Sequence, residues 1–95
     1  MEKETMYIAG SIFKVEFKHD GIIEQEKILL ARTFEPQKLF QVITISGYHA
    51  GEIEGYISYQ FENDLFCSFE HIEQELKIWV YLDLISLKEY KPRTI

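Results

Sequence analysis

Hydrophobic and polar residues alternate with a period of two in the first third of this chain. Between residues 13 and 18 the apolar positions are separated by lysine or glutamate, as in a strand with one face in water. Asp20-Gly21 follows, and this pair before an apolar restart is a strong signal for a tight turn. A second strand over residues 22–34 completes a predicted hairpin. Its expected core positions are Phe13, Val15, Phe17, Ile28, Leu30 and Phe34.

Two more strands are predicted in the middle of the chain. Pro36 ends the second strand, because proline cannot donate to a ladder. Residues 39–46 are rich in β-branched side chains and indicate a third strand, and residues 47–51 form a connection with glycine at each end. Residues 52–62 alternate cleanly and predict a fourth strand. The core face should carry Ile53, Gly55, Ile57, Tyr59 and Phe61, and the wet face Glu52, Glu54, Tyr56, Ser58, Gln60 and Glu62.

The last third of the chain fits two patterns. Residues 65–69 suggest a short fifth strand after a turn at 62–64. Residues 71–87 partly fit an amphipathic helix, but every second residue from Leu76 to Leu84 is apolar. This uninterrupted alternation favours a turn at 72–75 and a sixth strand over 76–87 that is apolar on both faces. The polar residues 91–95 are expected to fray.

Together these elements predict the fold class. We expect a single domain over residues 1–95 that is mainly β, an antiparallel meander of about six strands with at most one short helix. Such a sheet is expected to curl into a partial barrel or a two-layer sandwich, because it must bury one apolar face. A chain of 95 residues that is 46% hydrophobic can form one core.

The composition indicates a reducing compartment. Cys67 is the only cysteine in the sequence, so no internal disulfide can form. The charged first residues lack the apolar core of a signal peptide, and the apolar run over residues 78–82 is too short to span a bilayer. We therefore expect a cytoplasmic protein that does not enter a membrane.

Charge is distributed unevenly along the sequence, whose formal net charge is −6. Residues 39–76 contain seven acidic residues and no lysine or arginine, so that segment carries −7. The rest of the chain contains all ten basic residues and nine acidic ones, and carries +1. A surface of one sign attracts partners of the other, and nucleic acid needs lysine and arginine for its phosphates. The sequence thus favours a basic protein partner and argues against nucleic acid.

No motif in the sequence specifies a reaction. The glycines are isolated and form no phosphate-binding loop, and Cys67 is expected to be buried and structural. Because no nucleophile–base pair can be named, we predict that the protein is not an enzyme. No cofactor or metal is predicted, because neither group of possible ligands has a recognised spacing. Those two groups are His49 with Glu52 and Glu54, and His71 with Glu73 and Glu75.

The acidic middle segment also contains aromatic residues and is the predicted partner-binding surface. Tyrosine supplies contact area at low entropic cost, and carboxylates accept bidentate arginine. The alternative is that these carboxylates only keep the sheet soluble and prevent edge pairing. The expected partner-binding residues are Tyr48, His49, Glu52, Glu54, Tyr56, Glu62, Asp64, Glu70 and Glu73.

One stretch carries a resemblance to a known class of proteins. The stretch is residues 46–57, Ser-Gly-Tyr-His-Ala-Gly-Glu-Ile-Glu-Gly-Tyr-Ile, followed by the rest of the acidic segment. A small, acidic, β-rich chain with these features resembles the immunity proteins of bacterial polymorphic and contact-dependent growth inhibition toxin systems. The resemblance implies tight, stoichiometric binding of a basic cognate toxin, often a nuclease, with electrostatic steering of the encounter.

Three other functions stay open. A small carrier would enclose an apolar molecule in a β-barrel-like cavity, with Tyr59, Phe61, Phe69 and Trp79 as its expected lining. An enzyme would use His49 and the nearby carboxylates as acid and base. A subunit of a homo-oligomer would pair through an edge strand or through the two-sided apolar strand over 76–87, and the state expected here is a monomer or a weak homodimer.

Overall fold

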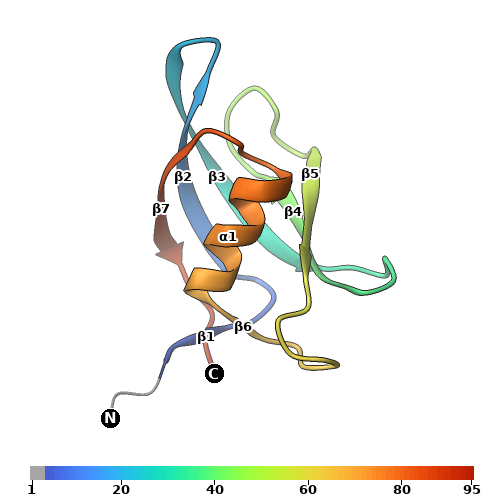
Figure 1. Cartoon of the computed structure of the whole chain (residues 1–95). Coiled ribbons are helices and arrows are strands. Elements are labelled where there is room, and N and C mark those ends of the chain that lie inside the picture. Colours follow the sequence, from blue (N-terminus) through green and yellow to red (C-terminus); the bar gives the residue numbers. More distant parts are fainter. Residues whose placement is uncertain (1–3) are drawn as a thin grey trace.

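Residues 4–95, which the computed structural model describes, form seven strands and one helix (Figure 1). The strands are β1 (Met6–Tyr7), β2 (Ile12–His19), β3 (Ile22–Arg32), β4 (Lys38–Thr44), β5 (Ile53–Ser58), β6 (Cys67–Ser68) and β7 (Leu84–Lys91), and the helix is α1 (Phe69–Trp79). The fold is mainly β with one short helix, as the alternation predicts. Within the described residues, no helix has the length and apolar character needed to cross a membrane.

The predicted first hairpin and its turn are confirmed. β2 and β3 pair from Ile12 with Leu29 to His19 with Ile22, which leaves Asp20 and Gly21 as a two-residue loop. Both loop residues have positive φ, 51° and 80°, as a type I′ turn requires, and glycine adopts this conformation without strain. The sequence signal and the turn geometry therefore agree.

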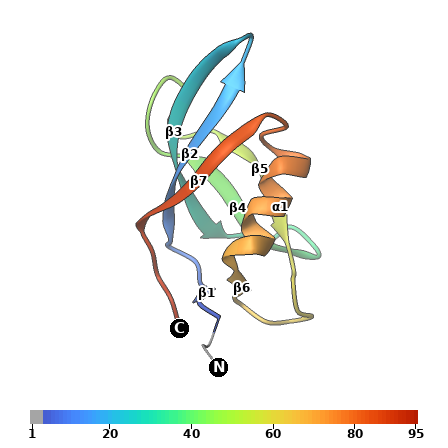
Figure 2. The same cartoon turned by 60° about the vertical axis from the view of Figure 1, so that its left-hand side comes forward.

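The main sheet contains five strands in the order β5-β4-β3-β2-β7, and all neighbours are antiparallel. Strands β2 to β5 form the predicted meander. Helix α1 then carries the chain across one face of the sheet, so that β7 pairs with β2 at the edge opposite β5 (Figure 1). The sheets do not close into a barrel, and the helix and the main sheet form two layers (Figure 2).

The predicted sixth strand over 76–87 and the turn at 72–75 are wrong, because α1 occupies the first part of this segment. Ser68 caps the helix by accepting a hydrogen bond from the His71 backbone N–H at 3.2 Å. Ile72 and Leu76 point to the sheet and are fully buried. The apolar alternation from Leu76 to Leu84 runs through the helix end and the turn before β7, so Ile78 and Leu82 are exposed.

Three smaller expectations are also wrong. Phe34 follows the end of β3 and is fully exposed, because the chain has already turned away from the sheet. The fifth strand is only β6, which pairs with β1 outside the main sheet. The C-terminal residues are held rather than frayed, since Thr94 forms a bridge with Tyr7 and the Ile95 N–H donates to the Met6 carbonyl at 3.1 Å.

The core lies between α1 and the inner face of the main sheet. An aromatic group forms part of it, with the Tyr7 and Phe13 ring centroids 5.2 Å apart and those of Phe13 and the partly buried Phe69 6.1 Å apart. Each fully buried side chain of the core contributes about 1.5–3 kcal/mol through apolar burial. The outer face of the sheet has no element of the described chain across it (Figure 2).

Gly55 marks the closest approach of β5 to the end of α1. A Cβ atom at this position would lie 2.8 Å from Val80 Cγ2, which is too close for two carbon atoms. We expect Gly55→Ala to lower the free energy of unfolding by about 1–3 kcal/mol, because Val80 is β-branched and can rotate little. Urea unfolding of the variant measures this loss.

The double variant Gly55→Ala/Val80→Ala separates the steric cause from a general preference for glycine. Removal of the Val80 γ-methyl groups should make the two substitutions strongly non-additive, with part of the Gly55→Ala loss recovered. Simple additivity of the two losses would mean that the contact with Val80 does not cause the effect.

Candidate binding site

A β-bulge changes which side chains face the core at the start of β5. The register between β4 and β5 shifts between Val42 and Ile43. As a result Ile53 lies on the outer face with 54% of its surface exposed. Glu54 instead turns inward, where its Oε1 accepts a hydrogen bond from Oγ1 of the buried Thr44 at 3.0 Å. The predicted faces of the fourth strand are therefore wrong at Ile53 and Glu54.

Glu54 borders a hollow of about 400 Å³ at the end of the sheet beyond the C-terminus of α1. We call it the hairpin hollow. It lies between the β2–β3 hairpin, the loop over 45–52 and the connection from α1 to β7 (Figure 1). Its charged and imidazole residues are Lys18, His19, Glu24, Glu26, His49, Glu54 and Asp83.

Glu26 and Tyr81 form the floor of the hairpin hollow. The Tyr81 hydroxyl donates a hydrogen bond to Glu26 Oε2 at 2.9 Å, and the Tyr81 ring stacks 4.7 Å from that of Phe17. Burial raises the pKa of Glu26, the hydrogen bond from Tyr81 lowers it, and the negative charge of Glu54 raises it further. The pKa of Tyr81 is raised for the matching reasons, burial first and then Glu26. The floor is thus a place where negative charge is poorly solvated.

The loop that carries His49 closes one side of the hollow. Gly47 and Gly51 adopt φ of 80° and 94°, and the Gly51 N–H donates to the Thr44 carbonyl at 2.6 Å. His49 Nδ1 lies 3.0 Å from Glu52 Oε2. One ligand atom from each of His49, Glu52 and Glu54 falls within 4.8 Å of the others, so these three side chains could reach one cation. The contact between His49 and Glu52 and the hydrogen bond from Thr44 to Glu54 already engage all three.

Among residues 4–95, the carboxylates of the hollow have no lysine or arginine within 4.0 Å, although Lys18 is one of the lining residues. Over residues 4–95, the pairs within 4.0 Å join only a histidine to a carboxylate: His19 with Asp20 and Glu24, and His49 with Glu52. No lysine or arginine of these residues makes such a pair. Burial is the largest cause of the raised pKa of Glu26, and the negative charge of Glu54 adds to it, because a like charge raises the cost of ionising a neighbouring carboxyl.

The nine predicted partner-binding residues do not form one surface. Tyr48, His49, Glu52 and Glu54 gather at the hairpin hollow, and the Tyr48 ring packs edge-on against His49 at 5.2 Å. The remaining residues lie elsewhere: Tyr56 opposite Gln41 on the outer face, Glu62 and Asp64 beyond the other end of β5, and Glu70 and Glu73 on α1.

Sequence reasoning missed four polar side chains of the hollow. His19, Glu24 and Glu26 belong to the hairpin, and Asp83 to the connection before β7. The signal was available for Glu24 and Glu26, since both share the parity of the core residue Ile28 and therefore point to the helix side. Charged residues on the core side of a strand indicate that this part of the sheet extends beyond the helix that packs on it.

The second group of possible metal ligands is used within the fold. His71 Nε2 lies 2.7 Å from the Ser58 carbonyl, and Glu75 Oε1 accepts the Ser58 N–H at 2.7 Å. Glu75 Oε2 also accepts a hydrogen bond from Trp79 Nε1 at 3.2 Å. These contacts join α1 to the end of β5.

Cys67 is fully buried, as predicted. Burial raises the pKa of its thiol to about 12, with a smaller contribution from the charge of Glu75. The thiol is therefore protonated at neutral pH and is a poor nucleophile.

The expected apolar cavity of the carrier hypothesis is not formed by its predicted lining. Trp79 is 63% exposed and Phe61 is 40% exposed, because the segment of Trp79 is helical and β5 has ended before Phe61. An apolar hollow of about 250 Å³ lies elsewhere, between Ile8, Ala9, Arg32, Leu39, Phe40 and Leu65.

Comparison of the chain with protein-family models, with curated proteins and with solved structures finds no match. The residues of the hollow and their geometry are therefore the basis for a functional proposal.

The raised pKa of Glu26 gives a prediction about stability. Its carboxyl binds a proton more tightly in the folded than in the unfolded state, so its contribution to stability is full in acid and is lost as pH rises through the folded pKa. Glu26→Gln keeps an acceptor for the Tyr81 hydroxyl and cannot ionise. We expect it to raise the free energy of unfolding at neutral pH and to change it less in mild acid, as measured by urea unfolding.

Glu35→Gln is the matched control, since Glu35 lies in the exposed turn before β4. It removes the same charge from the chain outside the hollow. A lower stability of Glu26→Gln at neutral pH would contradict the assignment of Glu26 as a destabilised carboxylate.

Proposed function

We propose that this protein binds and neutralises a basic protein partner through the hairpin hollow, as an immunity protein binds its cognate toxin. The observation that carries the proposal is the group of carboxylates around this hollow without a lysine or arginine partner among residues 4–95. The sequence resemblance to toxin immunity proteins points to the same role.

The hollow has the features of a receptor for a basic side chain. Glu24, Glu26 and Glu54 offer acceptors from two strands around one space, and a guanidinium can use two such oxygens at once. A cation there would offset the burial and the repulsion from Glu54 that raise the pKa of Glu26. Binding of a basic partner would thus be favoured, because its positive charge would stabilise the ionised carboxylate of Glu26, which is poorly stabilised in the free protein.

Exposed apolar side chains stand around this charged centre. Ile22 at the hairpin tip is 65% exposed, Leu82 is 80% exposed and Tyr48 is 97% exposed. Apolar and tyrosine side chains at an interface exclude water, and water exclusion strengthens a central charged contact. The net charge of −6 would also steer a basic partner toward the complex.

Charge reversal tests this proposal at a defined place. The candidate partners are basic proteins encoded beside this one, purified and titrated against it by calorimetry. Glu24→Lys/Glu52→Lys should weaken binding at least about 100-fold, because like charges facing each other across an interface cost several kcal/mol. Co-expression should protect growth with the natural protein and fail to protect it with this variant.

Glu62→Lys/Asp64→Lys provides the control. It makes the same change of net charge beyond the other end of β5, where both residues are exposed. We expect a loss of less than about threefold, since exposed charges more than a Debye length away are largely screened. Equal losses for the two double variants would refute the hollow as the binding site, and a failure of every neighbouring basic protein to bind would refute the function.

A further inference from the structure

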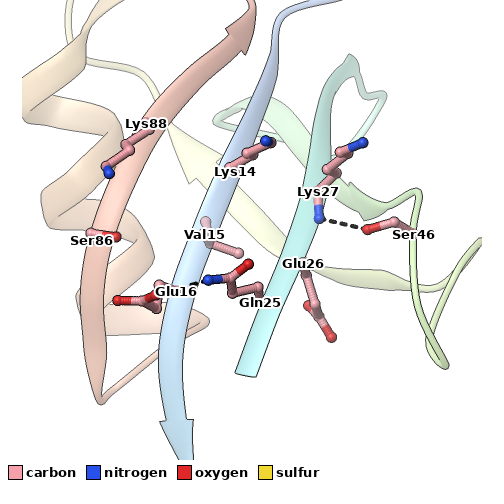
Figure 3. Close-up of a pocket in the computed structure, with 9 residues that line it drawn as sticks. All are labelled: Lys14, Val15, Glu16, Gln25, Glu26, Lys27, Ser46, Ser86 and Lys88. Carbon is pink, nitrogen blue, oxygen red and sulfur yellow. Dashed lines mark hydrogen bonds between the residues drawn. The ribbon is translucent and has the colours of Figure 1, made fainter. Parts of the chain in front are cut away.

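Three lysines lie directly beside one another across the outer face of the main sheet. Lys14 on β2 is the Cα partner of both Lys27 on β3 and Lys88 on β7. Figure 3 shows the three side chains in one row over three adjacent strands. We call Lys88, Lys14 and Lys27 the lysine row. The row spans about 10 Å, since neighbouring strands are about 4.8 Å apart.

The three ammonium groups have no direct carboxylate partner, since none of them has a carboxylate within 4.0 Å among residues 4–95. Glu16 stands in the next row, where its Oε2 accepts a hydrogen bond from Gln25 at 3.0 Å (Figure 3). Glu89 is engaged by the Tyr7 hydroxyl. Directly opposite like charges destabilise a sheet, so the row lowers the stability of the protein that carries it.

Tyr90 concentrates the positive charge further. The Lys27 Nζ lies 4.2 Å from the centroid of the Tyr90 ring, and those of Lys14 and Lys91 lie 5.0 and 5.7 Å from it. The contact with Lys27, and then the charge of Lys91, lowers the pKa of the Tyr90 hydroxyl. The ring thus draws several ammonium groups to one place, where an anion is favoured.

The face around the lysine row is also hollowed and polar. A depression of about 420 Å³ is bordered by the three lysines together with Gln25, Ser46 and Ser86, and Glu16 and Glu26 also line it. The Ser46 hydroxyl accepts the Lys27 backbone N–H at 2.8 Å, which ties the following loop to the rim (Figure 3). Amide and hydroxyl groups at this rim can donate hydrogen bonds to anionic oxygens.

We propose that the lysine row binds a ligand that carries two adjacent phosphate groups. A single phosphate ester brings about −1.5 to −2 charges, fewer than the positive charges of the row, whereas a diphosphate can neutralise them. Lysine binds phosphate as a point charge on a flexible stem, so three stems from neighbouring strands can converge on one diphosphate. This site lies on the face of the sheet opposite the hairpin hollow and is independent of the function proposed above.

The test uses the intact protein with pyrophosphate as the probe. Removal of the central charge in Lys14→Gln should relieve both like-charge pairs and raise the melting temperature by about 2–4 °C without ligand. The same variant should bind pyrophosphate at least about tenfold more weakly, as measured by calorimetry and by amide shifts of β2, β3 and β7. A gain of stability combined with a loss of binding is not expected from a purely structural lysine.

Lys18→Gln is the matched control. It removes one charge from the same strand and the same face, about 14 Å from Lys14, and its strand partner is Ile23 rather than a lysine. Its affinity for pyrophosphate should equal that of the natural protein. Adenosine diphosphate, compared with pyrophosphate, distinguishes a nucleotide from free diphosphate, and binding of either one supports the site.

Three results would overturn the proposal. The first is stabilisation by pyrophosphate no greater than that by sodium chloride of equal ionic strength. The second is an equal loss of binding in Lys14→Gln and Lys18→Gln. The third is binding of single-stranded DNA alone, which would make the lysine row a contact for a polymer backbone rather than for a small ligand.

Discussion

The structure depends on how far one short helix can cover a five-stranded sheet. Helix α1 has 11 residues and is therefore about 16 Å long, whereas β3 also has 11 residues and extends about 36 Å. Ile72 and Leu76 bury the middle of the inner face, and the sheet continues beyond them. The inner face of the sheet is apolar where α1 covers it. At the end of the hairpin the same face is exposed to water and must be polar, and the hairpin hollow lies at this polar end.

The alternation of side chains in β2 and β3 also separates the charges. In β3, Glu24 and Glu26 share the helix side with Ile28, while Lys27 points to the outer face beside Lys14. Carboxylates and lysines on neighbouring positions are thereby kept apart by the sheet itself. This arrangement accounts for part of the absence of lysine–carboxylate pairs over residues 4–95, whereas Glu16 shares the outer face with Lys14 and accepts a hydrogen bond from Gln25 instead. Stability comes from the aromatic and aliphatic core, and the charged groups are left for solvent or for ligands.

The sequence predicts the elements whose local signals agree with their environment. The Asp20-Gly21 turn and the buried Phe13 and Val15 follow directly from pattern and turn chemistry. The last third was misinterpreted because a period-two pattern arose by chance across the end of α1 and the turn before β7, while the helix was supported mainly by Ile72 and Leu76. When the same residues fit both a helix and a strand, the sequence pattern alone does not show which element packs on the sheet.

The candidate site was predicted in part for a similar reason. His49, Glu52 and Glu54 are close in sequence and meet in space, but the bulge between Val42 and Ile43 that turns Glu54 inward leaves no sequence signature. Glu26 and Tyr81 are 55 positions apart and meet only because the connection after α1 returns to the hairpin. The count of charges along the sequence predicts that the acidic segment is on the surface. It does not predict that Glu24 and Glu26 of the hairpin lie beside that segment.

The position of β7 determines the order in which this chain can fold. The β2–β3 hairpin requires closure of a two-residue loop, whereas β7 must find β2 after more than sixty intervening residues, as in the pairing of Val15 with Leu87. Loop closure over that distance is entropically costly and slow, so the hairpin forms early. The edge of β2 that pairs with β7 stays unpaired until β7 docks. During synthesis on the ribosome, the growing chain therefore exposes that unpaired edge until β7 emerges, and it is at this stage most open to mispairing with another chain.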